Sequence, residues 1–422
     1  MRILFVAMSN SIHTARWINQ LGGQGWDVHL FPSQDVGSVS PELREVTVHH
    51  SLYPGSLCAR QRACDRTIRL RGLPVILPGA KVRRPASFGG AGYVSASAVA
   101  AHLGRLALGE LWPNYRAIQL QRLVKKLRPD IIHSMEIQAA GYLMLEVRKR
   151  YEGQCPSWIV TNWGNDIYLF GHLDSHIGKI KAVLAACDYY SCECQRDVQL
   201  AIQMGFKGEI LPVLPNAGGY DLTRVAQFRQ PGPTSMRRLI LLKGYQDWHG
   251  RALVGLRAIA LCANELRGYR VGIYVANPDV KIAAELVSKS TGIPIEVIPQ
   301  CSHDDMLRQY GRARVYIGLS ISDGISISEL EAIMMGTFPI QSCTACADEW
   351  IVQGKNGFIV PPEDPQVIAD AIRRAVSDDA LVDQASELNS QISRERLDGN
   401  MIRPQVIAMY NKISAEIAMK KK

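Results

Sequence analysis

Short apolar segments alternate with amphipathic segments along the whole chain, and this alternation limits the fold more than any other feature. Residues 2–7 form the first apolar segment, residues 12–24 have apolar positions at helical spacing, and residues 27–32 form the second apolar segment. Repeated strand–helix units of this kind build a parallel sheet with helices on both faces. The sequence therefore predicts an α/β protein.

The same alternation predicts the remaining elements of both halves. In the first half, further strands are expected at 131–133, 158–163, 189–194 and 209–211, and helices at 114–127, 138–151, 174–186 and 195–204. In the second half, strands are expected at 239–243, 270–274, 295–298, 315–319, 338–341 and 358–360. Two doubly wound, Rossmann-like domains are the predicted architecture.

The length of the chain supports a division into two domains. A chain of 422 residues is too long for one ordinary core and suits two domains of roughly 150–200 residues each. Residues 215–219 and 230–233 are rich in Pro and Gly, as expected of a hinge. We predict a first domain at 1–216, a linker at 217–236, a second domain at 237–400, and a closing helix with a basic tail at 401–422.

Composition excludes several classes of protein. With 47% apolar and 21% charged residues, the chain is neither disordered, collagenous nor a coiled coil. No run of about 18 uninterrupted apolar residues occurs, and the opening residues resemble a buried strand more than a signal peptide. The ten cysteines have neither the spacing of a disulfide framework nor that of a zinc site. We expect a cytoplasmic protein with reduced thiols and no bound metal.

Positive charge is concentrated in one segment of the first half. The net charge of the chain is +9, and residues 59–84 supply +7 of it, with eight basic residues against Asp65. The neighbours of these arginines are aliphatic, whereas aromatic residues would be expected for stacking on nucleic-acid bases. The segment predicts an anionic partner, such as lipid headgroups or a polyanionic glycan, and no nucleic acid. A solvated loop that the arginines keep soluble is the alternative.

Two loops that follow predicted strands carry polar residues suited to ligand binding, because ligands of open α/β sheets bind beyond the carboxyl ends of the strands. After the first strand come Ser9, Asn10 and His13, at the start of a helix whose amides could meet an anion or a sugar hydroxyl. Ser9 or Asn10 could instead only cap that helix.

The second of these loops lies in residues 322–340, the most informative motif. There Asp323 precedes a turn, and a helix begins near Ser326 with Glu331 in its early turns. The amides of Gly324, Ile325 and Ser326 would point at an anion beyond the strand, which suits a phosphorylated sugar. The alternative is that the acids only complement the helix dipole.

Residues 322–340 resemble the E-x7-E signature of family-4 glycosyltransferases of the GT-B fold, in which two such domains face a cleft. Asp323 takes the first acidic place, although it is shorter than the usual Glu, and Glu331 takes the second. The resemblance implies that the first acid contacts the donor sugar, that the second holds the nucleotide ribose, and that the amides between them contact sugar and phosphate.

Three further segments resemble the same family in the same order. They are 128–133 (Arg-Pro-Asp-Ile-Ile-His), 214–216 (Leu-Pro-Asn) with Asp221, and 348–365, in which Glu349 stands among the donor-binding residues that the resemblance implies. The family also supplies an Arg and a Lys to the pyrophosphate from the loop after the first strand of the second domain. Tyr245 and His249 occupy those places here, so Lys243 and Arg251 are the candidates to replace them.

In the first domain, the resemblance concerns the turn at 162–166. It is similar to the family's His-Gly-Ser-Asp turn, but Trp163 stands in the His position, so Asp166 is the candidate for sugar contact or catalysis. A turn merely capped by Asp166 is the alternative. His133 and Glu136 end a strand and could position an acceptor hydroxyl, or could serve as core or capping residues.

These observations predict a cytoplasmic, metal-independent glycosyltransferase in which the second domain binds a nucleotide-diphosphate sugar and the first binds the acceptor. The resemblance implies retention of anomeric configuration. The acceptor is expected to be an anionic or lipid-linked glycan, with peripheral contact to the inner face of a membrane, and no cofactor is expected beyond the donor co-substrate. A nucleotide-sugar 2-epimerase of related fold and a non-catalytic sugar-binding protein are the alternatives.

Overall fold

The computed structural model describes residues 1–55, 57, 67–77, 81–83 and 93–420 of the chain, and these divide into two compact units. Unit 1 comprises Met1–Gly218 with Arg403–Lys422, and unit 2 comprises Gly219–Ile402. Most of the segment expected as a linker, 217–236, therefore belongs to unit 2, and most of the segment expected as a closing helix belongs to unit 1.

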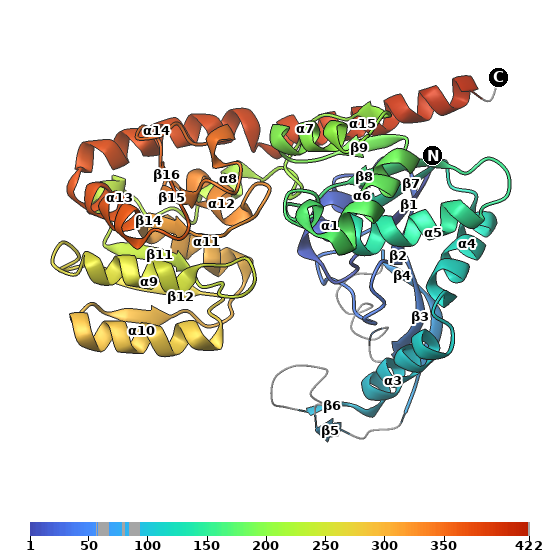
Figure 1. The fold of residues 1–422 in the computed structure, drawn as a ribbon, viewed down its shortest axis with the longest axis horizontal. Coiled ribbons are helices and arrows are strands. Elements are labelled where there is room, and N and C mark those ends of the chain that lie inside the picture. The colour runs from blue at the N-terminus through green and yellow to red at the C-terminus, as the bar shows by residue number, and fades with distance from the viewer. Residues whose placement is uncertain (56, 58–66, 78–80, 84–92, 421–422) are drawn as a thin grey trace. The chain divides into compact units, whose positions relative to one another are not determined.

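Unit 1 is built on an eight-stranded parallel sheet with the strand order β10-β9-β8-β7-β1-β2-β3-β4 (Figure 1). Its strands are β1 (Arg2–Ala7), β2 (Asp27–Pro32), β3 (Thr47–Pro54), β4 (Arg69–Val75), β7 (Ile131–Met135), β8 (Ser157–Thr161), β9 (Tyr189–Ser191) and β10 (Glu209–Ile210). A separate antiparallel pair joins β5 (Lys81–Arg83) to β6 (Tyr93–Ser95). The strands β1 and β7 at the centre of the large sheet are almost entirely buried, as expected of strands covered on both faces.

The helices of unit 1 connect these strands. They are α1 (Ile12–Asn19), α3 (Ala96–Leu111), α4 (Tyr115–Leu127), α5 (Tyr142–Arg150), α6 (Asp174–Ala186) and α7 (Gln195–Gln203), with a π-helical turn η2 (Ile137–Gly141) and a 3-10 turn η3 (Phe170–His172). Helix α1 ends five residues earlier than expected, because the chain turns at Gly22 and Gly23, and Gly23 has a left-handed φ of 76°.

Unit 2 contains a six-stranded parallel sheet with the order β13-β12-β11-β14-β15-β16. Its strands are β11 (Leu239–Lys243), β12 (Arg270–Tyr274), β13 (Ile295–Val297), β14 (Ala313–Gly318), β15 (Phe338–Ser342) and β16 (Phe358–Val360). Its helices are α8 (Leu222–Ala226), α9 (Ala252–Leu261), α10 (Pro278–Thr291), α11 (His303–Arg312), α12 (Ile327–Met334), α13 (Pro365–Ser377) and α14 (Asp379–Arg396), with 3-10 turns η4 (Thr234–Met236) and η5 (Ala347–Glu349). Two parallel α/β units confirm the predicted fold class.

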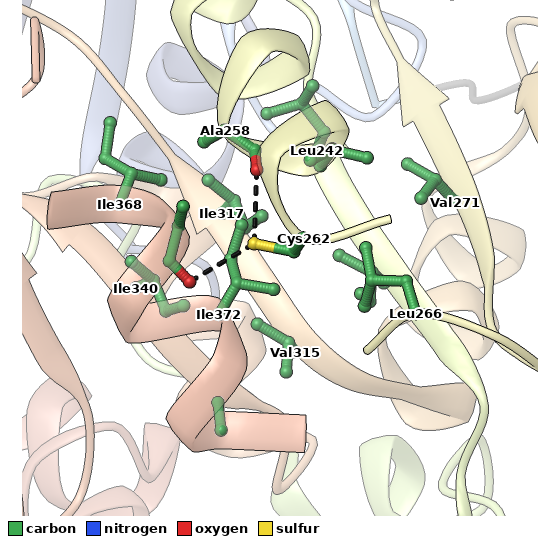
Figure 2. Packing of buried hydrophobic residues seen from close by; sticks show 14 of the residues in the cluster. Leu242, Ala258, Cys262, Leu266, Val271, Val315, Ile317, Ile340, Ile368 and Ile372 are labelled. Carbon is green, nitrogen blue, oxygen red and sulfur yellow. Dashed lines mark hydrogen bonds between the residues drawn. The ribbon is translucent and has the colours of Figure 1, made fainter. Parts of the chain in front are cut away.

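The core of unit 2 fixes the sheet that carries the loops discussed below. Figure 2 shows Leu242 and Ile317, from neighbouring strands, packed against α9 and α13 around Cys262. The Cys262 thiol donates to the carbonyls of Ala258 and Ala369, both at 3.2 Å. Burial raises the pKa of this thiol to about 12, so it remains protonated and serves packing.

The last helix, α15 (Gly399–Lys420), closes unit 1 from Arg403 onward. It runs alongside α7 and β9 (Figure 1), and the Tyr189 hydroxyl donates to Glu416 Oε2 at 2.7 Å. The indole of Trp17 on α1 donates to the Tyr410 hydroxyl at 3.0 Å. The end of the chain therefore contributes side chains to the interior of unit 1.

Candidate functional site

Three loops of unit 2 follow β11, β14 and β15 and are joined to one another by hydrogen bonds. The amide of Ile321 donates to the His249 carbonyl at 2.9 Å, and Gly250 forms a β-bridge with Ser320. The amide of Asp323 donates to the Thr344 carbonyl at 3.3 Å. Because the three strands are parallel, these loops meet at the carboxyl edge of the sheet, where ligands of such folds bind.

Gly250 lets the first two loops approach closely. A Cβ atom at this position would lie 2.3 Å from the Tyr245 carbonyl oxygen, a separation that side chains do not tolerate. The glycine therefore fixes the path of residues 244–251 across the edge of the sheet. The same path positions Lys243, His249 and Arg251 beside the loop that contains Asp323.

The loop after β14 ends at the N-terminus of α12. Asp323 Oδ1 accepts a hydrogen bond from the Gly324 amide at 2.9 Å, which orders the start of the turn. Ser326 is the N-cap residue of α12, and its side chain makes no capping hydrogen bond. The N-terminal amides of α12 therefore receive no side-chain cap and are suited to an external anion.

Glu331 lies one turn into α12 and is held by two neighbouring elements. Its Oε1 accepts from His303 Nε2 at 2.7 Å, at the start of α11, and from the Tyr220 hydroxyl at 3.4 Å. The side chain is buried, so these two donors fix its direction. This arrangement presents an oriented carboxylate, as the resemblance-based assignment to a ribose requires.

Glu329 is a site residue that the sequence reasoning missed. It is fully buried, and neither carboxylate oxygen has a hydrogen-bond partner among the described residues. Burial, together with the charges on Asp323 and Asp348, raises the pKa of Glu329 well above its usual range, while Lys243 acts in the opposite direction. A signal was present in the sequence, because Glu329 is a third acid between Asp323 and Glu331.

The loop after β11 brings cations to the same edge. Lys243 Nζ lies 4.9 Å from the centre of the Tyr245 ring, and its charge influences both Glu329 and His249. Burial lowers the pKa of His249 below its usual value, and Lys243 and Arg251 lower it further against the opposing charges of Asp247 and Asp323. These effects disfavour a positive charge on His249, which distinguishes it from the lysine that the family resemblance places there.

Arg251 is the last residue of this loop and lies immediately before α9. Its Nε pairs with Glu363 at 2.9 Å, and its Nη1 donates to the Gly250 carbonyl at 2.9 Å. Glu363 is largely exposed, so this ion pair lies in water and is weak. Arg251 remains a candidate for phosphate binding if it exchanges Glu363 for the ligand.

Glu349 lies in the turn η5 that follows β15. Its backbone carbonyl accepts from Arg396 Nη1 at 2.6 Å, and the Arg396 guanidinium lies 3.7 Å from the centre of the Trp350 ring. These contacts hold η5 against the end of α14. Glu349 therefore has a fixed backbone near the carboxyl end of β15, and its role toward the donor remains an expectation from the resemblance.

In unit 1, the loop after β1 uses its polar residues differently. The buried Ser9 hydroxyl donates to the Ser38 carbonyl at 2.6 Å, so it stabilises a neighbouring loop. Asn10 is exposed. His13 meets Trp163, which follows β8, with their rings edge to face and their centres 5.8 Å apart. Asn10, His13 and Trp163 therefore share the carboxyl edge of the sheet.

Glu136 and Asp166 form a buried acidic pair at this edge. Glu136 accepts from the amides of Ala139 and Ala140 at 3.0 and 2.7 Å, and thus caps η2. Asp166 Oδ2 accepts from the amides of Ile137 and Trp163 at 2.8 and 2.9 Å. Burial raises the pKa of both groups, and the charge of Glu136 raises that of Asp166 further. The alternative role predicted for Glu136 and Asp166, that of capping local structure, accounts for the hydrogen bonds of both residues.

His133 lies in the interior of unit 1 and not at its edge. Its Nδ1 bonds to the Tyr410 hydroxyl and its Nε2 to the Thr161 hydroxyl, both at 2.6 Å. Burial lowers its pKa to about 3, so the ring is neutral. With both nitrogens engaged by the protein, His133 has no atom left for an acceptor, and we leave it out of the candidate site.

Comparisons with known proteins agree with this division into units. Residues 2–58 and 112–192, in unit 1, match the family described as Glycosyl transferase 4-like, and residues 282–394, in unit 2, match Glycosyl transferases group 1. The comparison with curated proteins found no match. Within the described residues, none of the helices has both the length and the apolar character that crossing a membrane requires.

Several solved structures have the same fold. Sucrose-phosphate synthase from Thermosynechococcus elongatus is 16% identical, with a TM-score of 0.69 over 99% of this chain and 100% of that one. HepE from Anabaena is 14% identical, with a TM-score of 0.63 over 98% and 100%. A glycosyltransferase from Rickettsia africae is 13% identical, with a TM-score of 0.62 over 98% of each. At these identities the likeness concerns the fold.

Proposed function

Because the chain belongs to the glycosyltransferases of the GT-B fold, with a 4-like domain in unit 1 and a group 1 domain in unit 2, we propose that it transfers a sugar from a nucleotide-diphosphate sugar to a glycan or lipid-linked acceptor. The observation that carries this proposal is the loop after β14. It combines an uncapped helix N-terminus, an oriented Glu331 and the neighbouring cation Lys243.

We propose that unit 2 binds the donor. Glu331 accepts from the ribose hydroxyls, Asp323 contacts the sugar, and the amides of Ile325 and Ser326 meet sugar and phosphate oxygens, whereas the Gly324 amide already donates to Asp323. Lys243 and Arg251 neutralise the pyrophosphate, so leaving-group stabilisation comes from protein cations and amides. The nearby Asp247 is committed to its own turn, because it accepts from the amides of His249 and Gly250 at 3.0 and 2.9 Å.

The reaction proposed is a single transfer with retention of configuration, as the family resemblance implies. The bond between the anomeric carbon and the phosphate oxygen breaks, and the acceptor oxygen bonds to that carbon on the same face. The acceptor proton passes to a phosphate oxygen of the departing nucleoside diphosphate. We propose no covalent intermediate with the protein.

A donor screen tests the proposal first. HepE, which shares the fold, is described in complexes with UDP and with UDP-glucose, so these two compounds begin the series, followed by the other nucleoside diphosphates. Ligand at about 100 times its dissociation constant should add roughly 2.7 kcal/mol to the free energy of unfolding. No shift with any nucleoside diphosphate would contradict the donor site.

Product analysis then separates the proposed transfer from its alternatives. Free nucleoside diphosphate that forms only when acceptor is present supports sugar transfer. Interconversion of the nucleotide sugar without acceptor would identify an epimerase. Binding without either reaction would identify a non-catalytic sugar-binding protein. The basic segment at 59–84 suggests an anionic or lipid-linked acceptor, but four of its eight basic residues, Arg60, Arg62, Arg66 and Arg84, lie outside the described residues.

A further inference from the structure

A surface cavity of about 600 Å³ lies in unit 2, at the edge of the sheet opposite the loops proposed to bind the donor. Arg238, Arg270 and Arg312 line it, and all three are exposed. Neither Asp nor Glu occurs among the described residues that line this cavity. Because β11 begins after Arg238 and ends at Lys243, roughly 15 Å of strand separates the cavity from the donor loops. We call it the arginine cavity.

The register of the sheet brings the three arginines close together. Arg238 immediately precedes β11, Arg270 is the first residue of β12, and Arg312 immediately precedes β14, while β11 lies between the other two strands. The Arg270 amide donates to the Arg238 carbonyl at 3.0 Å, and Leu239 is in register with both Arg270 and Ala313. Neighbouring strands lie about 4.8 Å apart. Three positive charges therefore begin in one row, where like charges repel one another.

The middle arginine, Arg238, is held in place by the protein. Its Nη1 donates to the carbonyls of Ser235 and Arg237 at 2.6 and 3.0 Å. Its guanidinium carbon lies 5.3 Å from the centre of the Tyr269 ring, which also lines the cavity. Tyr269 is buried, and its hydroxyl donates to the Val376 carbonyl at 3.4 Å. These contacts order one guanidinium at the wall of the cavity, which reduces the entropy that a ligand must remove on binding.

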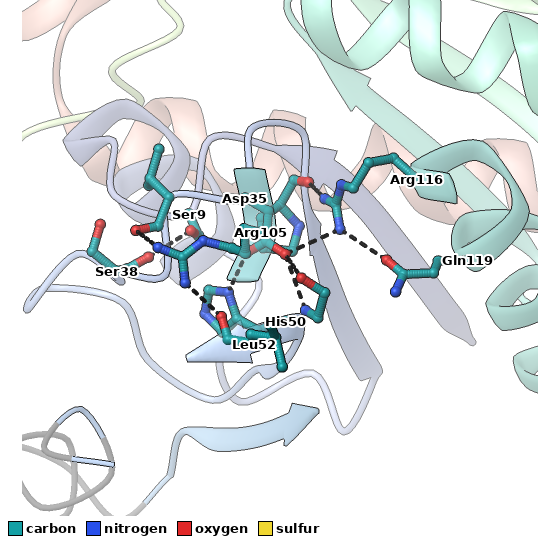
Figure 3. Close-up of polar contacts among 11 residues, drawn as sticks. Ser9, Asp35, Ser38, His50, Leu52, Arg105, Arg116 and Gln119 are labelled. Carbon is teal, nitrogen blue, oxygen red and sulfur yellow. Dashed lines mark hydrogen bonds and ion pairs between the residues drawn. The ribbon is translucent and has the colours of Figure 1, made fainter. Parts of the chain in front are cut away.

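Arginines that serve the fold of this chain have acceptors and opposite charges within the protein. Figure 3 shows such a cluster in unit 1, where Arg116 pairs with Asp35 at 3.3 Å and the buried Arg105 donates to two backbone carbonyls. In unit 2, the buried Arg314 pairs with Asp379 at 2.6 Å. By contrast, none of the three arginines of the cavity forms an ion pair with another residue that the structure describes. Their charges are therefore available to an external anion.

The end of helix α11 accounts for one of the three charges. Arg312 lies in the last turn of this helix, where a cation complements the negative end of the helix dipole. Arg238 and Arg270 lie at the starts of strands, and the dipoles of a sheet largely cancel. The helix dipole therefore does not explain why three cations surround one cavity.

We propose that the arginine cavity binds a small organic phosphate at a site separate from the donor loops. The guanidinium fork matches the oxygens of a phosphate group, and three such forks suit a ligand with more than one negative charge. The volume of the cavity corresponds to about twenty water molecules, which leaves room for an organic part beside the phosphate. Binding at this site goes beyond the proposed function and requires no sugar transfer.

Isothermal titration of the full chain with fructose 1,6-bisphosphate, inorganic phosphate and fructose tests the proposal. We expect the bisphosphate to bind, inorganic phosphate to bind at least about tenfold more weakly because it engages fewer arginines, and fructose not to bind. R238Q/R270Q should weaken binding of the bisphosphate by at least about tenfold, since it removes two charged donors. The matched control is R257Q/R394Q, which removes two exposed arginines of unit 2 outside the cavity and should change the affinity by less than about twofold.

Several outcomes would overturn the proposal. They are equal affinity of R238Q/R270Q and the wild type, absence of bisphosphate binding, and an equal rise in thermal midpoint with sodium chloride at the same ionic strength, which would indicate screening alone. Loss of bisphosphate binding in K243A would place that ligand in the donor loops instead. A lower thermal midpoint of R238Q/R270Q without ligand would show that these arginines serve the fold. Bisphosphate binding without nucleotide binding or sugar transfer would refute the proposed function and leave the arginine cavity as a binding site.

Discussion

Two strand-to-helix connections of this chain both place a serine at the N-cap of the helix, but only one of these serines caps it. In unit 1, β1 leads through Ser9 and Ser11 into α1, and in unit 2, β14 leads through Asp323 and Ser326 into α12. Ser11 Oγ accepts from the His13 amide at 3.2 Å and so caps its own helix. Ser326 holds the same N-cap position and makes no such bond. The polar loop of unit 1 therefore stabilises the fold, and the polar loop of unit 2 remains available to a ligand.

The difference shows that a serine-rich turn before a helix does not by itself identify a binding site. The N-terminal amides of both helices carry partial positive charge, but only in α12 does no side chain of the N-cap residue occupy them. The surroundings reinforce the contrast, since Lys243 influences Glu329 near α12 whereas Ser9 donates to a backbone carbonyl near α1. The predictions below separate a loop that binds from a loop that folds.

The largest effect is expected from the cations of unit 2. Lys243→Ala should lower turnover by a factor on the order of 10²–10³, the loss that follows removal of one preorganised group that stabilises developing charge. Arg251→Ala should lower turnover by a factor of the same order, because we propose that Arg251 exchanges Glu363 for the pyrophosphate when the donor binds. Nucleoside diphosphate release in the presence of acceptor is the measurement.

Lys281→Ala is the matched control for these cations, because Lys281 is exposed on α10 of the same unit. It should leave turnover within about twofold of the wild type, as expected for a surface substitution. Full activity of both Lys243→Ala and Arg251→Ala would refute their assignment to the pyrophosphate.

The two acids of the signature should separate binding from turnover. Glu331→Gln should weaken nucleoside diphosphate binding by roughly tenfold or more, since it removes the charge from a hydrogen bond worth about 1.5–3 kcal/mol. Asp323→Asn should lower turnover more than nucleotide affinity, because it acts on the transferred sugar. Isothermal titration and steady-state kinetics of both variants measure the split. Unchanged nucleotide affinity in Glu331→Gln would remove the ribose assignment.

The strands at the centre of both sheets were predictable from sequence because they are buried on both faces. Residues 2–7 and 239–243 form the central strands expected there, since a strand without a solvent face appears as a nearly uninterrupted apolar run. The motif at 322–340 was equally predictable, because a strand, a glycine turn and a helix start follow one another within it. The fold class and the family could therefore be inferred without coordinates.

The edge of unit 1 and the interior of the site could not be predicted in this way. Strand β4 lies at the sheet edge and is exposed along most of its length, so it lacks an apolar pattern. Helix α3 exposes apolar residues and buries an arginine. The spacing of its apolar residues therefore does not indicate which face of the helix is buried. The sequence left both a site role and a core role open for His133, because its position at a predicted strand end does not reveal that Tyr410, 277 residues away, occupies one of its nitrogens.

A smaller effect is expected from the buried acid of unit 2, and it depends on pH. The pKa of folded Glu329 is raised above the ordinary value of 4.5, so the folded protein retains a proton that the unfolded chain loses. The free energy of unfolding of the wild type therefore falls as the pH rises above about 4.5, by at most about 1.4 kcal/mol per pH unit from this group.

The Glu329→Gln variant lacks this titrating carboxyl group. The difference in free energy of unfolding between the variant and the wild type should therefore shift in favour of the variant from pH 5 to pH 8, by at most about 1.4 kcal/mol per pH unit. Urea denaturation at several pH values provides the measurement. Glu387→Gln on α14 is the control, because Glu387 is exposed. A constant difference between Glu329→Gln and the wild type across this range would show that the carboxyl is ionised as usual.

The smallest effect tests the opening contrast directly with one substitution made at two equivalent positions. Ser11→Ala removes the cap of α1 and should lower the free energy of unfolding by about 1 kcal/mol, with unchanged affinity for the nucleoside diphosphate. Ser326→Ala removes a side chain that makes no cap, so it should cost less stability and should instead alter ligand affinity. Denaturant unfolding gives the free energy of unfolding of each variant, and titration gives its affinity for the nucleoside diphosphate. If Ser326→Ala lost as much stability as Ser11→Ala and bound the nucleotide normally, the two loops would have the same structural role, and the N-terminus of α12 would no longer support a donor site.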